Sequence, residues 1–515
     1  MKMNIRHIFR RLPLLTLLLV ALACDDAYDE LNTNVVDPTA IDPIFQLNNA
    51  IIESAFPNTT LVYDLGIVQQ ITTPNSGVLV GANFNQDNRI VTEQTWQNYY
   101  RNVIKETRDI LSDEEALAGR DNLRQMTRIL QAHAFMILTD SYGSIPYFEA
   151  GAGFNEQILY PEYDAQPEIY ADLINELREA SAALNADSRV ESGDILYGGN
   201  IAQWKQYGYS LLLRAGMRLS KVNPDQARAI AAEAFQAGVI TTNANNMVIR
   251  HDANYVNGIG RTLNATEANN YYLAEAFVDY LQETNDPRLA AIAVRYVGAA
   301  SGPGQKLGAD GNGSNDPAVQ IGMPVGNNDE TARQVAASLG LTSFYEFSQA
   351  DRERVVKQTA PTFMVTAAQN LLLLAEAAQL GWVSGVAAEF FTAGVRAHME
   401  QMASYDPGSA VPEAEIVAYL AANPFDAANA LEQINTQYWV ASFLNGPEAF
   451  ANFRRSGFPD LAPNPFPNQD IAADFIRRIT YPASEIAVNT ANVNEAIARM
   501  GPDRLDTRVW WDVEQ

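Results

Sequence analysis

Three polar loop segments combine the side-chain types that hold a polyhydroxylated ligand. Aromatic rings stack on C–H-rich faces, and a few planar polar groups that converge on a concave surface fix the ligand's orientation. The segments are GANFNQDNR (81–89), HDANYVNGIGRT (251–262) and NNYY (269–272). The alternative is that their asparagines and glycines only build turns. The candidate ligand-binding residues are Asn83, Phe84, Asn88, Arg89, Tyr255, Asn257, Tyr271 and Tyr272.

A fourth segment, DGNGSND, places oxygen-bearing side chains at every second position. Asp310, Asn312, Ser314 and Asp316 resemble the first half of a calcium-binding loop. An EF-hand needs a bidentate glutamate at the twelfth position, where this chain has Ile321. The sequence therefore favours a flexible turn. We expect no cofactor and no metal ion, with a structural Ca²⁺ as the alternative.

The sequence lacks the motifs of several common catalytic sites. Its four histidines show no HExxH spacing, and it contains no GxSxG elbow, P-loop or Rossmann fingerprint. The 61 acidic residues leave open a glycosidase pair of carboxylates. We expect almost all of them on solvated helix faces instead.

Amphipathic helices must position these candidates, because helical patterns recur along the whole chain. The apolar residues of 121–143 are spaced three and four apart, which predicts a helix capped by Asp121 and ended by Gly143. The segment 164–185 predicts a second helix, with Asp164 as its N-cap. Further helices are expected at 199–222, 225–237, 363–380, 384–403, 426–445 and 483–500.

This alternation of helices and short connectors predicts an all-α fold, an α-solenoid with tetratricopeptide-like repeats. No strict 34-residue period is present, so the repeats are degenerate. Two stretches, 240–268 and 296–328, are rich in Asn, Gly and Pro and are expected to be long irregular loops. No low-complexity linker divides 44–515, which we expect to be a single domain.

The N-terminal 43 residues have the pattern of targeting and anchoring segments. Four cations precede an apolar run at 12–23, as in a secretory signal peptide too short to span a bilayer. The residues directly before Cys24, the only cysteine, resemble the lipobox of bacterial lipoproteins. We expect 1–23 to be removed, Cys24 to be lipidated and 24–43 to form a tether; the alternative is a buried thiol. Asp25 and Asp26 resemble the signal that sends Bacteroidota lipoproteins to the outer face of the outer membrane.

The charge balance excludes partners that need a broad basic surface. The net charge is −26, and removal of 1–23 takes away four cations and no acids. Such a chain repels nucleic acid and anionic lipid, so we expect no nucleic-acid partner. Contact with the membrane is expected through the lipid anchor only.

Several sequence blocks, in this order along nearly the whole mature chain, resemble the SusD/RagB-like family of outer-membrane nutrient-binding lipoproteins. The Trp-Trp-Asp tail is similar to that of one SusD-like subgroup. The blocks are DAYDELNTNVVDPTAIDP (26–43), LTDSYGSIPYFEA (138–150), YDAQPEIYADLINELREA (163–180), WKQYGYSLLLRAGMRLS (204–220), FMVTAAQNLLLLAEAAQLGW (363–382), INTQYWVASFLNGPEAFANFRRSGFP (434–459), ITYPASEIAVN (479–489) and VWWDVEQ (509–515).

The resemblance implies a surface lipoprotein with a mostly helical fold on four tetratricopeptide-like helix pairs. It implies capture of an oligosaccharide or peptide, delivery to a SusC-like TonB-dependent transporter, and no catalysis. It also implies an outer-membrane location that faces the cell exterior. Two alternatives come from other classes: a helical-repeat scaffold or adhesin without a small-molecule ligand, and a helical glycoside hydrolase.

The most distinctive residues of these blocks are expected to be structural. Arg454 and Arg455 suggest an anion site, but pairing with acids or helix C-terminal carbonyls is favoured. Arg214 and Arg218 lie one turn apart on a helix and are expected to pair with nearby acids. The indoles of 510–512 are expected to pack the C-terminal tail onto the body.

Overall fold

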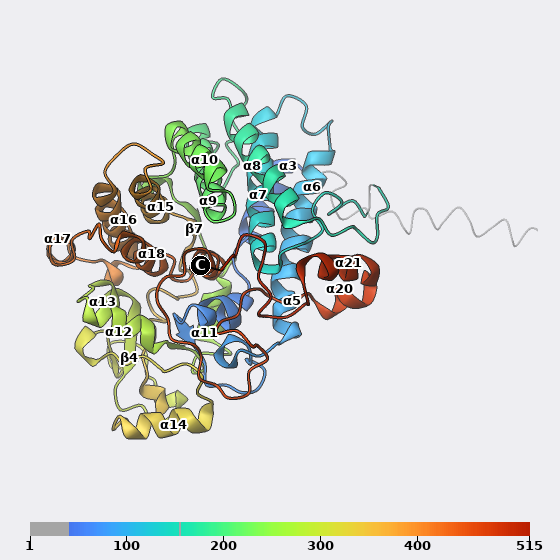
Figure 1. Ribbon diagram of the computed structural model, residues 1–515. Coiled ribbons are helices and arrows are strands. Elements are labelled where there is room, and N and C mark those ends of the chain that lie inside the picture. The colour runs from blue at the N-terminus through green and yellow to red at the C-terminus, as the bar shows by residue number, and fades with distance from the viewer. Residues whose placement is uncertain (1–40, 154–155, 515) are drawn as a thin grey trace, which may run out of the picture. The chain divides into compact units, whose positions relative to one another are not determined.

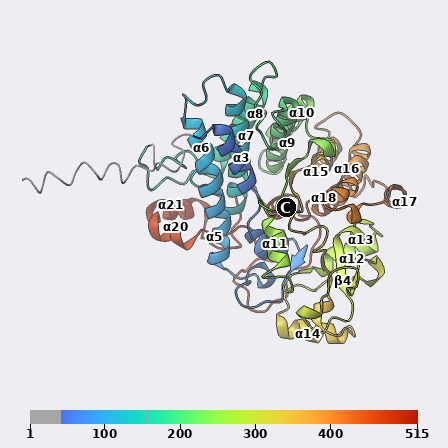
Figure 2. The ribbon, with the colours of Figure 1, turned by 180° about the vertical axis from the view of Figure 1, so that it is seen from behind.

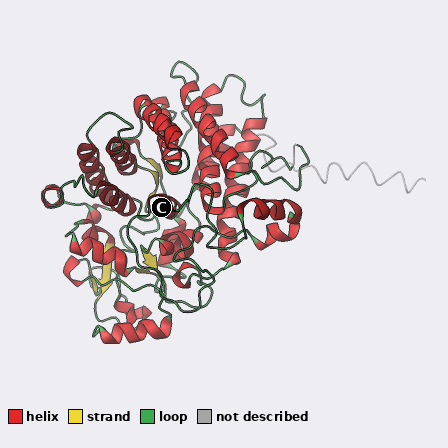
Figure 3. Cartoon of the chain, in the orientation of Figure 1, coloured by secondary structure: helices red, strands yellow, loops and turns green. Residues whose placement is uncertain are grey.

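Helices joined by loops and short strands make up the chain in the computed structural model (Figures 1 and 3). The structure describes residues 41–153 and 156–514. The predicted signal peptide and Cys24 lie outside these residues. The chain from Pro43 onward forms one unit. In the described part, no helix is long and apolar enough to cross a lipid bilayer.

Four consecutive helices pack side by side in chain order. Views from both sides show α7 beside α8, and contacts continue from α8 to α9 and from α9 to α10 (Figures 1 and 2). This succession of helix pairs confirms the predicted all-α, tetratricopeptide-like architecture. The four helices are α7 (Asp121–Tyr142), α8 (Gln166–Ala183), α9 (Ile201–Arg218) and α10 (Pro224–Ala237).

The local sequence explains where α7 and α8 begin and end. Gly143 ends α7 with a φ of 83°, as predicted, because glycine adopts positive φ without strain. The predicted N-caps are each wrong by one residue. Asp121 is the first residue of α7, and Ala165 rather than Asp164 precedes α8. The Asp164 carboxylate instead accepts a hydrogen bond from the backbone N–H of Tyr147, 2.9 Å away.

A second group of helices completes the same core. Helix α15 packs against α16, α18 and α9, while α19 packs against α18 and α7. The prediction missed α19, because Gly446 and Pro447 look like a helix break, yet proline is well suited to a helix's first turn. These helices are α15 (Ala367–Gln379), α16 (Ala387–Gln401), α18 (Ala430–Ala441) and α19 (Gly446–Ser456).

Short antiparallel strand pairs interrupt the helical pattern. The predicted helix at 363–380 begins only at Ala367, where Thr366 and Gln369 form a capping box, because the residues before it form β7. The stretches 240–268 and 296–328, predicted to be irregular, contain strands β2 and β5. The pairs are β1 (Ile71–Thr72) with β3 (Tyr272–Leu273), β2 (Met247–Ile249) with β7 (Thr362–Val365), and β4 (Ala293–Tyr296) with both β5 (Gly313–Ser314) and β6 (Gln349–Ala350).

The remaining helices are mostly shorter and connect or flank these groups. The predicted helix at 483–500 is divided into two, α20 and α21. The α-helices are α3 (Pro43–Glu53), α4 (Leu65–Ile67), α5 (Arg89–Asn98), α6 (Lys105–Ser112), α11 (Gly258–Asn264), α12 (Glu275–Glu283), α13 (Arg288–Ile292), α14 (Asp329–Ser338), α17 (Glu413–Ala422), α20 (Ala483–Val488) and α21 (Thr490–Met500), with π-helical turns at Thr60–Asp64 and Tyr99–Ile104.

A buried network of charges joins α7, α9 and α19. Arg218 on α9 lies 3.2 Å from the Asp140 carboxylate of α7 and 2.6 Å from the Glu448 carboxylate of α19. Arg214 approaches Glu448 to 3.2 Å. Burial alone raises the pKa of Glu448, but the two guanidinium groups hold it below its usual value. The predicted pairing of Arg214 and Arg218 with acids is confirmed.

The C-terminal tail is fixed to this network by Trp511. Its indole N–H donates to the second oxygen of Asp140 at 2.9 Å, and its ring is fully buried. The Arg218 and Arg454 guanidinium carbons lie 5.7 and 4.7 Å from the ring centroid, within range of cation–π attraction. The predicted packing of the tail by its tryptophans is therefore confirmed for Trp511.

A second buried ion pair holds α19 against α15. Arg455 forms a bidentate pair with Glu376, both bonds at 2.6 Å, and its Nε donates to Asn452. Arg454 instead donates to the carbonyl oxygens of Phe450 and Arg477. Both arginines therefore have the structural roles that the sequence favoured over an anion site.

We expect Glu448→Ala to lower the free energy of unfolding by about 3–5 kcal/mol, because it leaves two buried guanidinium groups without their shared carboxylate. Urea unfolding monitored by circular dichroism measures this change. Glu233→Ala is the control, since its pair with Arg178 is more than a third exposed and should contribute at most about 1 kcal/mol. Equal losses in the two variants would contradict a dominant role for the network.

Asp64 is a buried carboxyl without an ion-pair partner among the described residues. Its carboxyl group accepts a hydrogen bond from the Thr60 hydroxyl at 3.2 Å. Burial raises its pKa from 3.8 to about 7, while the hydrogen bond and the distant charge of Arg454 oppose the rise. The folded protein therefore holds a proton on Asp64 at pH values where the unfolded chain has lost it.

We expect Asp64→Asn to stabilise the protein relative to the parent as the pH rises. Between pH 4 and 7 the raised pKa lowers the parent's stability by about 1.4 kcal/mol per pH unit, and the amide removes that loss. Thermal unfolding of both proteins at pH 5 and pH 8 measures the difference, with the exposed Asp225→Asn as control. If the stability difference between Asp64→Asn and the parent were the same at pH 5 and pH 8, the raised pKa of Asp64 would be contradicted.

Candidate ligand-binding site

The segment 81–89 is built into the protein interior. Asn83 is buried, and its amide donates to the carbonyl oxygens of Thr73 and Asn75, both at 3.0 Å. The buried ring of Phe84 packs on Phe466 with 4.4 Å between the centroids. These contacts fix the loop to its surroundings and leave neither side chain facing solvent.

Asn88 and Arg89 tie the same loop to other segments. The Asn88 amide donates to the carbonyl oxygen of Val80 at 2.9 Å. The Arg89 guanidinium donates to the Asp503 carboxylate at 2.7 Å and to the carbonyl oxygen of Tyr481 at 2.8 Å. Both side chains are partly exposed, so their contact with a ligand stays a prediction.

The segment 251–262 also contributes mainly to the fold. The Asn257 side chain caps α11 through the Gly260 N–H and donates to the carbonyl oxygen of Ala360 at 2.8 Å. Gly260 is required there, because an added Cβ would lie 2.5 Å from the Lys357 carbonyl oxygen. Only Tyr255 exposes a large ring, with 55% of its surface accessible, and its role stays a prediction.

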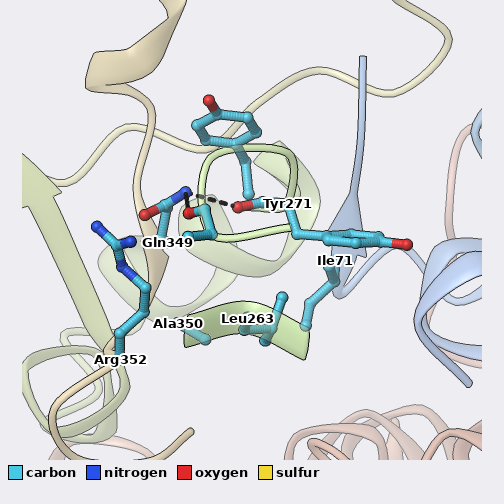
Figure 4. A pocket seen from close by; sticks show the side chains of 8 residues that line it. Ile71, Leu263, Tyr271, Gln349, Ala350 and Arg352 are labelled. Carbon is cyan, nitrogen blue, oxygen red and sulfur yellow. Dashed lines mark hydrogen bonds between the residues drawn. The ribbon is translucent and has the colours of Figure 1, made fainter. Parts of the chain in front are cut away.

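Tyr271 and Tyr272 line a small pocket beside β3 (Figure 4). Gln349 closes it, donating to the Tyr271 carbonyl oxygen at 3.0 Å. The pocket volume of about 10 Å³ has room for one water molecule but none for a sugar ring. Both tyrosines are almost fully buried. Burial gives five of the eight candidates a role in the fold, and their contact with a ligand stays a prediction: Asn83, Phe84, Asn257, Tyr271 and Tyr272.

A groove of about 770 Å³ lies between α12, α17 and the turn at 316–318, and we call it the α12–α17 groove. Its volume falls in the range of small-molecule sites. Small apolar residues line much of it, and amide and carboxylate side chains accompany them. The apolar set is Leu281, Pro287, Pro317, Ala318, Ala418 and Ala422, and the polar set includes Gln282, Asn285, Asp316, Glu415 and Asn423.

Hydrogen bonds within the protein hold the groove's planar amides in place. Gln282 donates to the carbonyl oxygens of Pro317 and Gln320, at 2.8 and 3.0 Å. Asn423 donates to the Tyr419 carbonyl oxygen at 3.1 Å. The Asn285 side chain is exposed, on a backbone with a φ of 52° that asparagine tolerates. Fixed amides beside an apolar floor suit hydroxyl-rich ligands with apolar faces.

The groove's charge selects against anionic ligands. Asp286, Asp316 and Glu415 line it, and no arginine or lysine is among the described residues that do. Asp286 is already paired with Arg288, and both are fully buried. The two remaining carboxylates would repel a negatively charged ligand. A neutral ligand therefore fits this groove best.

Residues of the segment considered for Ca²⁺ serve as turn-forming groups. The Asp316 carboxylate accepts from the Ala318 N–H at 3.0 Å, which starts the turn at the groove. Asn312 accepts from the Lys306 N–H and donates to the Val297 carbonyl oxygen, both at 3.0 Å. Ser314 lies in β5. These bonds give Asn312 and Asp316 a role in the local fold.

Sequence reasoning missed the α12–α17 groove, because α12 and α17 are separated by more than a hundred residues. The available signal was weak. Asn285 and Asn423 each follow the end of a helix, where asparagine commonly serves as a cap. Only the fold places them in one groove.

Comparison with known proteins places this architecture in a family. A SusD-like family model, described as "Starch-binding associating with outer membrane", matches residues 36–482. The match covers most of the chain, so the chain belongs to this SusD-like family. A comparison with curated protein sequences gives no significant match.

Solved structures support the same assignment. A structure titled as a chitin-binding protein is 29% identical, covers 92% of this chain and 100% of its own, and superimposes with a TM-score of 0.79. A SusD-like protein described as Bacteroidetes AC2a is 25% identical over the same shares, with a TM-score of 0.80. A chitin-binding SusD homolog from Flavobacterium johnsoniae is 23% identical and covers 92% of this chain and 96% of its own; its TM-score of 0.71 shows a shared fold.

Proposed function

We propose that this chain is a cell-surface glycan-binding lipoprotein that delivers its ligand to a SusC-like TonB-dependent transporter. The observation that carries the proposal is the SusD-like family match over residues 36–482. A glycan is favoured over a peptide because the family description names starch and a 29% identical structure is titled chitin-binding. The protein binds and does not transform its ligand.

The α12–α17 groove is the proposed place of capture. Its apolar floor offers a surface for the C–H faces of sugar rings. Gln282 and Asn423, whose N–H groups donate to backbone carbonyls, offer their amide oxygens to hydroxyls, and Asn285 offers its whole amide. Its uncompensated carboxylates favour neutral sugars such as chitin and starch oligosaccharides over acidic ones. Tyr255, Asn88 and Arg89 are further candidates outside this groove.

Attachment to the outer membrane would come from acylation of Cys24. The lipid holds the protein at the cell exterior beside its transporter, and the energy of transport belongs to the transporter. Several buried methylene groups make such an anchor firm, since each contributes about 0.8 kcal/mol.

We expect Ala418→Trp to weaken binding of neutral oligosaccharides at least tenfold, because an indole at this exposed position fills the groove. Isothermal titration calorimetry of the chain from Asp25 onward, with chitin and starch oligosaccharides and peptides as probes, measures the effect. Val417→Trp is the matched control, since Val417 neighbours Ala418 but does not line the groove. If Ala418→Trp bound oligosaccharides as tightly as the parent, the groove would not be the ligand-binding site. If no glycan bound to the parent, the proposed function would be contradicted.

We expect Cys24→Ser to abolish lipidation and release the protein from the membrane, because serine supplies no thiol for acylation. Mass spectrometry of the N-terminal peptide and fractionation of cells that express the full chain measure both effects. A Ser54→Ala variant, which alters a side chain buried in the folded body, controls for changes in expression. A Cys24→Ser protein that stays in the outer-membrane fraction would contradict lipid anchoring.

A further inference from the structure

A second pocket lies between α6, α7 and α8, far along the chain from the α12–α17 groove. Both views show these helices on the side of the molecule opposite α12 and α17 (Figures 1 and 2). The pocket, which we call the α6–α8 pocket, has a volume of about 360 Å³. The side chains that matter for its chemistry are Arg108, Arg124, Arg128, Phe148, Asp172 and Glu176.

The two carboxylates in the α6–α8 pocket are already satisfied. Glu176 is held by Arg128 through two bonds of 2.8 and 2.9 Å. Asp172 accepts a hydrogen bond of 2.7 Å from the Tyr147 hydroxyl. Burial and this nearby carboxylate raise the pKa of Tyr147 far above its usual value, so the phenol keeps its proton. Glu176 is therefore neutralised by Arg128, whereas Asp172 has a hydrogen bond but no ion pair among the described residues.

Arg108 is the cation of the pocket that lacks a carboxylate. Its terminal nitrogen donates to the Tyr147 carbonyl oxygen at 2.8 Å, and no carboxylate pairs with it among the described residues. Its Nε is buried without a hydrogen-bond partner. A guanidinium group presents donors in a fork that matches a carboxylate, so Arg108 has unused capacity to bind one.

Arg124 adds a second cation, and a ligand's carboxylate is able to compete with Glu114 for it. Its partner Glu114 lies 2.6 Å away, but the Glu114 side chain is 77% exposed. A pair of this kind contributes little to stability and yields readily to a competing anion. The pocket thus offers two guanidinium groups to an anion, and the carboxylates of Asp172 and Glu176 lie beside them.

The exposed ring of Phe148 completes a site for a sugar. The ring has 53% of its surface accessible, packs against Tyr147 at 4.9 Å and forms one wall of the pocket. An aromatic face beside a forked cation matches a pyranose that carries a carboxylate. We propose that the α6–α8 pocket binds an acidic monosaccharide unit of the uronic acid type, with Arg108 on its carboxylate and Phe148 on its ring. This inference goes beyond the proposed function, because it assigns a second site to a different class of ligand.

The test compares methyl β-glucuronide with methyl β-glucoside, which differ at one carbon, by NMR titration of the chain from Asp25 onward. The glucuronide should bind saturably and the glucoside at least tenfold more weakly. Arg108→Gln should weaken glucuronide binding at least tenfold, and Phe148→Ala, at an exposed position, should weaken it without affecting the fold. Equal binding of the two sugars would overturn the proposal.

Two control variants test whether the glucuronide binds in the α6–α8 pocket itself. Arg178→Gln removes an arginine of α8 that pairs with Glu233 outside the pocket, and it should leave glucuronide affinity unchanged. Ala418→Trp, which fills the α12–α17 groove, should leave it unchanged as well. Loss of glucuronide binding in Ala418→Trp, or retention in both Arg108→Gln and Phe148→Ala, would place the acid elsewhere and overturn the assignment.

Discussion

The helical body depends on the rule that a charge removed from water must be paired. Arg218 is fully buried, and it is compensated only where Asp140 of α7 and Glu448 of α19 meet it. A misplacement of either helix would leave an uncompensated ion in the interior, at a cost of several kcal/mol. The network therefore selects one arrangement of three helices from distant parts of the chain. The Trp511 bond to Asp140 adds the C-terminal tail to the same arrangement.

This rigid frame determines which surfaces are left for ligands. In the polar loops that border this frame, side chains such as Asn83 and Asn257 donate hydrogen bonds to backbone carbonyl oxygens, because buried carbonyl oxygens require donors. Polar groups that line a pocket or groove occur instead between helices. Asn285 stands at such a place near α17, and Arg108 at another beside α7. Both candidate sites are therefore concave surfaces between helices that the core holds in fixed positions.

The sequence predicted what depends on local periodicity. The 3.6-residue pattern indicated the helix in 121–143 and its end at Gly143. The spacing of Arg214 and Arg218, one turn apart on a helix, indicated that they pair with nearby acids. It could not identify Glu448 as the partner, because more than two hundred residues separate it from Arg218. Strands β2 and β7 were missed for the same reason, since their pairing is long-range. The sequence could not show that Asn83 and Asn257 are bound to backbone carbonyls, because an asparagine that binds a ligand and one that binds a carbonyl have the same local sequence.

Net charge is a poor guide to what each surface of this molecule binds. Its value of −26 suggests repulsion of every anion, yet salt screens exposed charges beyond about 8 Å at physiological ionic strength. A ligand in the α6–α8 pocket therefore interacts mainly with Arg108 and its immediate neighbours. A ligand in the α12–α17 groove meets Asp316 and Glu415 in the same way. The two proposed sites of one acidic chain thus differ in the charge they offer, because an arginine without a paired carboxylate lines the α6–α8 pocket and no arginine or lysine is among the described residues that line the α12–α17 groove.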